Sequence, residues 1–305
     1  AEFNNSVGSF GTLKNTFKAG SGLIKDHFTF DARGSHLQSD GYIDRASSKL
    51  WSYYLSGAYY GESTILRFNH FSGIETTYQA WNGIDSATLA TDRTANTAGT
   101  DFGQKEVPYD NETDNYKQDH YQFFISQQFK EHWVANGALF YTRGRGYFEQ
   151  YKVQENFGDY QLQNVLVGND TISETDLIRR RWLDNYFYGA TFSLNYQKLN
   201  KLDVTLGGSW NQYDGDHFGE IIWAQYASNG AINHRYYDNN GLKTTSNMYA
   251  KAIYNFSKKF LGFADMQYRR VSYSVAGIDN DQRFIFEDVD YNFFKISTIS
   301  EYLEK

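Results

Sequence analysis

The sequence predicts an all-β protein, an antiparallel β-barrel that crosses a membrane with its strands. Three observations carry this prediction: apolar and polar side chains alternate every two residues, 18% of the 305 residues are aromatic, and proline is almost absent. Average usage of about 5% would give roughly 15 prolines, but Pro108 stands alone. Proline is excluded from the interior of β-ladders, so its scarcity beside so many aromatics favours long, continuous strands.

The clearest strand is the run 185–197. One parity of this run is apolar, with aromatic residues at both ends, and the other parity is mostly polar or small. A strand with lipid on one side and water on the other has this pattern. We therefore expect Tyr186 and Tyr196 to face outward at the two membrane interfaces.

The same alternation recurs along the chain, with turn signals between its copies. About eleven strands are expected, near 8–20, 27–36, 51–60, from 64 onward, 121–129, 133–142, 185–197, 202–211, 248–256, 260–269 and 286–297. Short connections alternate with long ones, which are expected at 37–47, 74–117, 144–182, 213–244 and 272–285. Outer-membrane barrels have this asymmetry, with tight turns on one rim and long loops on the other. Single-chain bacterial barrels have an even number of strands, so eleven implies either an error of one strand or an incomplete barrel.

Several classes of protein are excluded by composition. Mean hydropathy is -0.65, and no stretch approaches the roughly 18 apolar residues of a membrane-spanning helix. The formal charge is -7 and the only basic run is 179–181, so no nucleic-acid partner is expected. We expect this basic run to lie at the end of a strand, at the mouth of the barrel. Cysteine is absent, and no HExxH, GxSxG or phosphate-binding glycine loop occurs. We expect neither an enzyme nor a cofactor.

Aromatic and cationic side chains in the predicted long loops are the candidates for ligand contact. Such residues stack on a sugar, a corrin or a catecholate, and loops on a rigid scaffold commonly carry recognition. Packing within the loops explains any one of them equally well. The candidates are Tyr78, Trp81, Trp223, Tyr226, His234, Arg235, Tyr236 and Tyr237.

Charged residues on the polar parity of the predicted strands are expected to line the lumen of the barrel. There they would pair with one another or with a plug, and substitutions would alter selectivity more than stability. These residues are Asp31, Arg33, Arg67, Lys251, Asp265 and Arg269.

An acidic group within seven residues offers a possible calcium site. It consists of Asp214, Asp216 and Glu220, with His217 among them, and calcium prefers oxygen ligands. The group lacks the ligand spacing of a known calcium loop. A solvated acidic turn is therefore the preferred interpretation, and the metal content stays open.

Five motifs resemble a known family. Segments 39–44 (SDGYID), 113–122 (TDNYKQDHYQ) and 144–151 (GRGYFEQY) resemble TonB-dependent outer-membrane receptors. Segments 182–189 (WLDNYFYG) and 210–220 (WNQYDGDHFGE) are similar to the receptors of Bacteroides-type bacteria. The resemblance covers nearly the whole chain.

The resemblance implies a 22-stranded barrel with an N-terminal plug in the bacterial outer membrane. It implies uptake of a scarce nutrient, such as an iron-siderophore, haem, cobalamin or a glycan, with energy relayed by TonB. The sequence departs from the family pattern in two places, since no plug or TonB box precedes residue 1 and the strand pattern stops after 292–294. We therefore expect residues 1–305 to form a partial barrel domain, its first half, without the plug.

The expected partners are outer-membrane lipid, a small nutrient ligand, the TonB system through a plug outside this chain, and a surface lipoprotein. Two alternatives remain at this point. One is a passive porin-like or structural outer-membrane barrel, and the other is a soluble β-rich glycan-binding protein or glycosidase.

Overall fold

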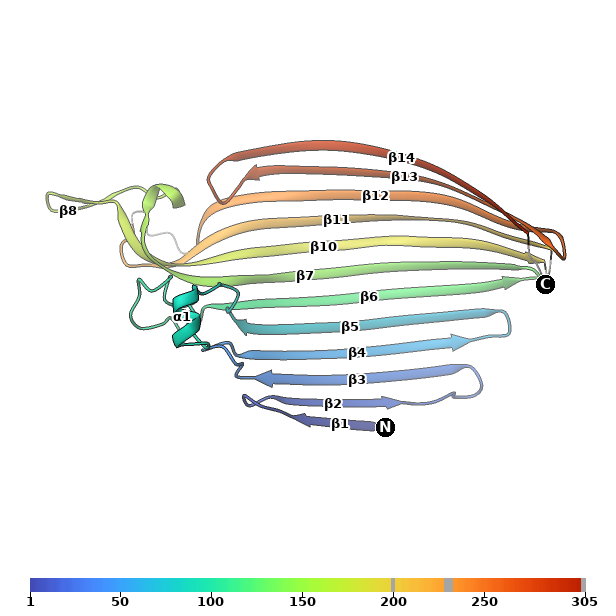
Figure 1. Cartoon of the computed structure of the whole chain (residues 1–305), viewed down its shortest axis with the longest axis horizontal. Coiled ribbons are helices and arrows are strands. Elements are labelled where there is room, and N and C mark those ends of the chain that lie inside the picture. Colours follow the sequence, from blue (N-terminus) through green and yellow to red (C-terminus); the bar gives the residue numbers. More distant parts are fainter. Residues whose placement is uncertain (199–200, 228–232, 303–305) are drawn as a thin grey trace.

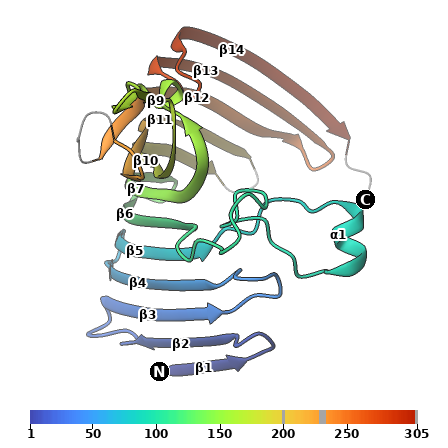
Figure 2. The same ribbon diagram turned by 90° about the vertical axis from the view of Figure 1, so that its left-hand side faces the viewer.

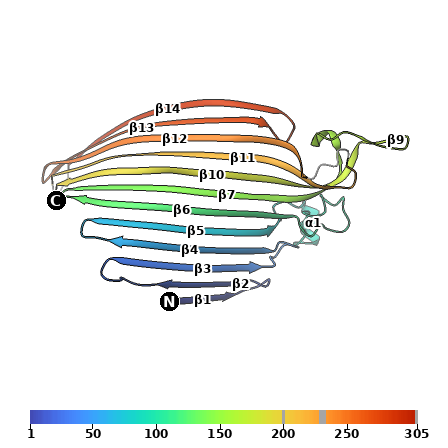
Figure 3. The same ribbon diagram turned by 180° about the vertical axis from the view of Figure 1, so that it is seen from behind.

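The computed structural model describes residues 1–198, 201–227 and 233–302. Within these residues, twelve strands form one antiparallel sheet in chain order (Figure 1). Their bounds are β1 Glu2–Val7, β2 Leu13–Gly20, β3 Phe28–Ser39, β4 Ser48–Tyr60, β5 Thr64–Tyr78, β6 Thr113–Phe129, β7 Trp133–Asn156, β10 Glu174–Lys198, β11 Leu202–Ala224, β12 His234–Ser257, β13 Phe260–Ile278 and β14 Phe284–Tyr302. The described sheet is not closed, because β1 and β14 form its two edges (Figure 3).

Three small elements lie outside this sheet. They are the helix α1 Ser86–Thr91, the 3-10 helix η1 Phe157–Tyr160, and a hairpin of β8 Val165–Val167 and β9 Asp170–Ile172. Neither of these two helices, the only ones in the described residues, is long and apolar enough to cross a membrane.

The all-β antiparallel fold is as predicted, and the large sheet has twelve strands, one more than the eleven expected. The segment expected as a single strand at 8–20 belongs to the hairpin of β1 and β2. Phe10 and Gly11 have positive φ in the turn of this hairpin. All residues of β1 are exposed, and Asn4, Asn5 and Ser6 interrupt the alternation that marks the other strands.

The expected loops at 144–182 and 213–244 were too long, since most of these residues are strand. β7 continues to Asn156, β10 begins at Glu174, and β11 and β12 together leave a connection of only 225–233. Beyond the apolar band, aromatic and charged side chains occupy both faces of these strands, so the two-residue alternation disappears although the ladder continues. The longest connection, 79–112, lies between β5 and β6 and carries α1. Turns at 61–63, 130–132 and 258–259 lie on the opposite rim.

The sheet curves so that one of its faces is concave and the other convex, and the loop that carries α1 extends toward the concave side (Figure 2). Antiparallel pairing places residues that lie opposite each other on the same face. Leu194 pairs with Leu206 and Ala190 with Trp210 on the convex face. Large apolar side chains exposed on this face include Leu139, Phe192, Leu206, Met248 and Met266.

A continuous aromatic row crosses the convex face toward the long-loop rim. We call it the tyrosine row, and it consists of Tyr53, His70, Tyr121, Tyr141 and Tyr186 on five neighbouring strands. Successive ring centroids are 5.3, 4.4, 6.1 and 6.3 Å apart. Toward the turn rim, Trp133 packs against Tyr196 at 4.8 Å.

The two aromatic levels have the spacing of a bilayer. Tyr186 and Tyr196 are ten residues apart on β10. With a rise of about 3.3 Å per residue and a tilt of about 40°, this separation spans about 25 Å along the barrel axis. Outer-membrane barrels carry an apolar band of about this height between aromatic girdles.

The buried hydrophobic core of the described residues lies beyond the tyrosine row, at the long-loop end. It consists of Tyr160, Leu177, Ile221, Tyr236 and Tyr237. A single curved sheet has no second layer to bury its apolar face. A core therefore forms only where η1 folds back onto the extended strands.

Candidate functional site

A cleft of about 490 Å³ opens on the concave face at the long-loop end, between the extended strands and the loop 79–112. Two rows of directly opposed residues form its floor. The first row is Asp114, Phe148, Arg181, Gly219 and Tyr237, and the second is Tyr116, Gly146, Leu183, His217 and Asn239. Trp81 of the loop also lines the cleft, as do Tyr147, Trp182 and Asn280.

Glycine makes room for an aromatic ring in this floor. The hydroxyl of Tyr116 donates to Oδ1 of Asn185 at 2.9 Å, passing over β7. A Cβ at Gly144 would lie 2.1 Å from the Tyr116 hydroxyl oxygen, and a Cβ at Gly146 would lie 2.1 Å from the carbonyl oxygen of Asn115. The alternation in 143–146 (RGRG) thus places two glycines under Tyr116 and two arginines on the convex face.

Aromatic rings surround one guanidinium at the floor of the cleft. The rings of Trp81 and Phe148 meet edge to face at 5.6 Å. The guanidinium of Arg181 lies 5.7 Å from the centre of the Phe148 ring, and its Nε donates to the Tyr236 hydroxyl at 3.4 Å. A cation held among aromatic faces suits a planar, electron-rich anion.

Burial shifts the pKa values of two titratable groups in the cleft. Desolvation lowers the pKa of His217 below its usual range, which favours the neutral imidazole. Desolvation also raises the pKa of Asp114 above its usual range, which weakens its tendency to carry a negative charge. Among the described residues that line the cleft, Arg181 is the only permanent cation.

The loop 79–112 is held against β7 by a buried carboxylate, that of Glu149, which is 1% exposed. Its Oε1 accepts hydrogen bonds from the Tyr109 hydroxyl and Asn111 Nδ2, both at 2.6 Å. Its Oε2 accepts from Arg180 Nε at 2.7 Å. Charge-assisted bonds of this kind are about twice as strong as neutral ones. Glu149 follows Phe148 on β7, and Arg180 precedes Arg181 on β10. Since neighbouring side chains of a strand point to opposite faces, Glu149 and Arg180 point away from the cleft. The loop that they hold supplies Trp81 to the cleft.

A second ion pair anchors the same loop to β7, three residues beyond Glu149 on that strand. Asp101 is paired with Lys152 and also accepts a hydrogen bond from Val153 N at 2.9 Å. Glu112, 4% exposed, lies at the end of the loop, and its Oε2 has no hydrogen-bond partner. Burial raises the pKa of the Glu112 carboxyl above its usual range.

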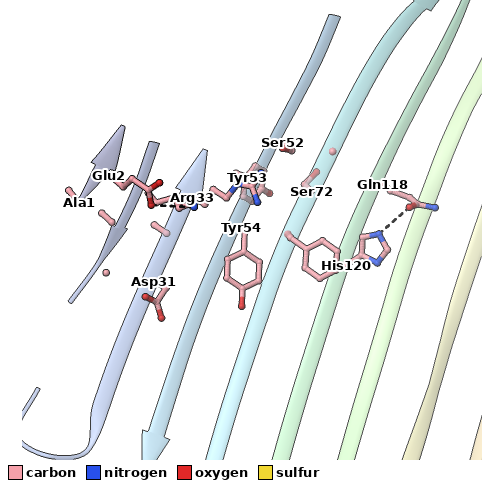
Figure 4. A pocket seen from close by; sticks show the side chains of 16 residues that line it. Ala1, Glu2, Asp31, Arg33, Ser52, Tyr53, Tyr54, Ser72, Gln118 and His120 are labelled. Carbon is pink, nitrogen blue, oxygen red and sulfur yellow. Dashed lines mark hydrogen bonds and ion pairs between the residues drawn. The ribbon is translucent and has the colours of Figure 1, made fainter. Parts of the chain in front are cut away.

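A larger cavity of about 930 Å³ lies lower on the concave face, over β1 to β6 (Figure 4). Asp31, Arg33 and Tyr54 line it, together with His120. His120 stacks on Phe71 at 4.3 Å.

A chain of hydrogen bonds connects the two cavities. Gln118 Nε2 donates to the Tyr116 hydroxyl at 3.3 Å, and the Gln118 Oε1 lies 3.1 Å from His120 Nε2. His120 Nδ1 lies 3.0 Å from the hydroxyl oxygen of Thr142. The cleft and the lower concave wall therefore share one line of polar contacts.

The eight predicted ligand-contact residues do not all lie in loops. Trp81 and Tyr226 lie in connections, whereas Tyr78, Trp223 and the segment 234–237 belong to strands, so the loop prediction is wrong for these six. Long strands replace the loops here because β5, β11 and β12 continue their pairing with neighbouring strands beyond the apolar band. Trp81 and Tyr237 are brought together in the cleft.

The other six lie outside the cleft lining. Tyr78 and Tyr236 are buried, and Trp223 stacks on Tyr151 at 6.0 Å. His234 Nε2 lies 2.8 Å from the Tyr160 carbonyl oxygen. Arg235 contacts Phe218 and Asp238, and the backbone N–H of Tyr226 donates to the Thr175 hydroxyl at 2.9 Å.

The six residues expected in the lumen all lie on the face opposite the tyrosine row. Arg33 pairs in register with Tyr54, Lys251 with Asp265, and Arg269 with Asn247. Asp31 lies opposite Ser56, and Arg67 opposite Phe124. Among the described residues, no ion pair joins any two of the six, and their pairing with a plug, the other alternative, stays a prediction.

The acidic group of the sequence is not assembled around a common point. Asn240 Nδ2 donates to Asp214 at 2.7 Å and to Asp216 at 2.8 Å, and Trp182 Nε1 donates to Glu220 at 2.9 Å. In the part of the chain that the structure describes, no group of three His, Asp or Glu side chains is arranged to hold a metal ion. The three residues lie on a strand, β11, rather than in the expected turn.

Sequence reasoning did not select Phe148, Arg181, Tyr116 or Asn239 as ligand-contact residues. A signal was nevertheless present, since three of the family-like motifs contain Tyr116, Phe148 and His217. Pairing between strands far apart in sequence brings these motifs into one cleft, and this pairing is not readable from any one motif.

No protein-family model matches the chain, and no curated protein matches its sequence. Solved structures do match its fold. The unliganded ferric citrate transporter FecA has a TM-score of 0.68 at 11% identity, over 99% of this chain and 41% of FecA. The siderophore receptor PiuA from Acinetobacter baumannii has a TM-score of 0.66 at 7% identity, over 96% of this chain and 45% of PiuA. The ferric-catecholate import receptor Fiu from E. coli K12 has a TM-score of 0.63 at 12% identity, over 97% of this chain and 50% of Fiu.

The chain thus spans about half the length of the solved structures it matches. Each of the three is a receptor or a transporter by name, and none is an enzyme. The open antiparallel sheet of this chain therefore resembles about half of the β-barrel of TonB-dependent receptors.

Proposed function

We propose that this chain forms part of the wall of an outer-membrane receptor that takes up a scarce nutrient with energy relayed by TonB. The convex face supports the membrane position, because its apolar side chains lie between two aromatic levels about 25 Å apart. The concave face supports transport, because it carries two cavities joined by polar contacts. The six charged concave residues without ion pairs among themselves are proposed to face a plug domain that couples the barrel to TonB.

We further propose that the nutrient is an anionic, π-rich chelate, as an iron-siderophore is. The observation that carries this choice is the position of Arg181 between Phe148 and the Tyr236 hydroxyl, at the floor of a cleft closed by Trp81. Haem, cobalamin and neutral glycans are included in the binding test, since aromatic side chains bind them too. A neutral glycan does not require the positive charge of Arg181, so the effect of removing this charge distinguishes a glycan from an anionic chelate.

The test is equilibrium binding of the full chain in lipid vesicles to a panel of ferric catecholate, ferric citrate, haem, cobalamin and a neutral oligosaccharide. Quenching of tryptophan fluorescence, in a variant that keeps Trp81 as its single tryptophan, reports occupancy. We expect saturable binding of an anionic chelate, weakened at least about tenfold by Arg181→Gln, the equivalent of 1.4 kcal/mol. Arg269→Gln, on the same face but outside the cleft lining, is the matched control. Saturable binding of only the oligosaccharide, unchanged in Arg181→Gln, would refute the chelate assignment.

Uptake tests the transport proposal separately. Cells that carry the gene in its native setting should accumulate the labelled chelate only when TonB is present. Accumulation without TonB would support the passive porin-like alternative instead.

A further inference from the structure

The convex face of β2 to β5 contains a furrow. Two adjacent hollows of about 420 and 590 Å³ follow one another along β3. Gly34 and Ala32 form the floor, because their side chains are too small to fill the surface between the flanking strands. Phe17 and Tyr53 stand opposite Gly34 on the two sides, and Leu55 stands opposite Ala32.

The walls of the furrow are apolar and half exposed. Phe17, Phe30 and Leu55 are 50%, 57% and 49% exposed, and Trp51 at the upper end is 60% exposed. At the upper end of the furrow, His36 stacks on Trp51 with ring centroids 4.0 Å apart. The Tyr53 hydroxyl lies 2.7 Å from His70 Nε2 within the tyrosine row.

The dimensions of the furrow fit one leaflet of a bilayer. From Trp51 to Gly57 the strand advances six residues, which is about 20 Å at 3.3 Å per residue and about 15 Å along the barrel axis at a tilt of 40°. The hydrocarbon core of a bilayer is about 30 Å thick, so about 15 Å is the depth of one leaflet. The furrow begins at the level of the tyrosine row, where lipid headgroups lie, and runs toward the middle of the membrane.

We propose that this furrow binds one acyl chain of an outer-leaflet lipid as a defined site. The inference rests on the proposed membrane position of the convex face. A lipid chain is the occupant that the surroundings favour, because the furrow is continuous with exposed apolar side chains on the same face and its polar end lies at the headgroup level. Since lipid tails are as apolar as the walls, preference for the site comes from close packing in the hollows rather than from the hydrophobic effect.

Gly34 offers a direct test, because a Cβ built there meets nothing within 4 Å. Gly34→Leu therefore places a side chain in the furrow with no neighbour within 4 Å of its Cβ. Gly73→Leu is the matched control: Gly73 lies on β5 near the same region but on the concave face, and its Cβ also meets only one atom, at 4.0 Å.

The experiment uses the full chain in phospholipid vesicles that contain a fraction of lipid with brominated acyl chains. Two single-tryptophan variants are compared. In one, quenching of Trp51 reports lipid in the furrow, and in the other, quenching of Trp210 reports lipid at a part of the convex face outside the furrow. We expect Trp51 to show saturable quenching with a preference of about fivefold over Trp210, the equivalent of about 1 kcal/mol at 1.4 kcal/mol per tenfold. Gly34→Leu should abolish this preference and Gly73→Leu should leave it unchanged. Native mass spectrometry of chains with all tryptophans retained should show one lipid fewer on Gly34→Leu.

The other outcomes each overturn a specific statement. Equal, non-saturable quenching of Trp51 and Trp210 overturns the defined site and leaves the proposed function intact. Quenching of Trp210 but not of Trp51 overturns the lipid as occupant and indicates that a second protein surface covers the furrow. Absence of quenching at both positions overturns the membrane position itself.

Discussion

The Tyr116 hydroxyl hydrogen-bonds to Asn185 Oδ1 at 2.9 Å across a strand that separates them, and Gly144 on that strand makes the bond possible. Residues 69 positions apart are thus joined at the floor of the candidate cleft. A Cβ at Gly144 would lie 2.1 Å from the Tyr116 oxygen and 2.7 Å from the Asn185 oxygen. The contact depends on the absence of a side chain between them.

Gly144→Ala should therefore break this contact and destabilise the fold by about 1–3 kcal/mol, the usual cost of overpacking. Thermal unfolding followed by circular dichroism measures the loss. Gly241→Ala is the control, because Gly241 lies in the same cross-strand row and a Cβ there meets nothing within 4 Å. Equal melting temperatures for the two variants would contradict the role given to Gly144.

Glu149→Gln should loosen the loop 79–112. The substitution removes the charge that pairs with Arg180 and weakens the hydrogen bonds from Tyr109 and Asn111. We expect faster tryptic cleavage after Arg93 and Lys105, with the barrel strands still resistant. Glu106→Gln, an exposed carboxylate in the same loop, should leave the cleavage rate unchanged. A Glu149→Gln loop as resistant as that control would show that the carboxylate does not hold the loop.

Glu112 should make the stability of this loop depend on pH. Burial raises the pKa of its carboxyl in the folded state, so folding favours the protonated form. The resulting stabilisation is complete below the ordinary carboxyl pKa of about 4.3 and is lost as pH rises through the folded pKa. Glu112→Gln should therefore protect the loop amides from hydrogen exchange at pH 7 and give little protection at pH 4. Greater protection at pH 4 than at pH 7 would reverse the assigned sign.

Arg181→Lys should weaken binding of an anionic chelate although it retains the positive charge. Lysine lacks the planar guanidinium that lies over Phe148 and donates to Tyr236. We expect a loss of about fivefold, near the 1 kcal/mol typical of such a contact, less than for Arg181→Gln. Titration at two salt concentrations separates the effects, since the lysine variant keeps its salt dependence and the glutamine variant loses most of it. Wild-type affinity in Arg181→Lys would mean that charge alone is recognised.

Much of the fold is predictable from local pattern. The alternation at 185–197 predicts which parity faces outward, and the convex positions of Leu194 and Ala190 follow from it. The positions of Asp31, Arg33 and Lys251 on the opposite face follow from the same rule. Pattern failed at 144–182 and 213–244, where both faces of the strands are polar or aromatic and the period of two disappears although the backbone ladder continues.

The candidate cleft was less predictable. Trp81 and Tyr237 were selected as exposed aromatics in loops, but Tyr237 is 8% exposed in the core at the cleft edge. Tyr236, its neighbour, is buried and reaches the cleft only through its hydroxyl, which accepts from Arg181. Tyr236 and Tyr237 are buried because η1 folds back over the strands. The two-residue alternation of a strand does not predict this burial.

By itself the sequence determined the strand character, the two faces and the rim that carries long connections, because each depends on residues that are neighbours along the chain. Only the tertiary structure decided which of these residues meet. Register between β6, β7, β10, β11 and β12 places Tyr116, Phe148, Arg181 and His217 in one cleft. Curvature of the sheet and the anchoring of the loop at Glu149 then bring Trp81 over them. These relationships depend on pairing across tens of residues, where the energy of contact and not local propensity selects the arrangement.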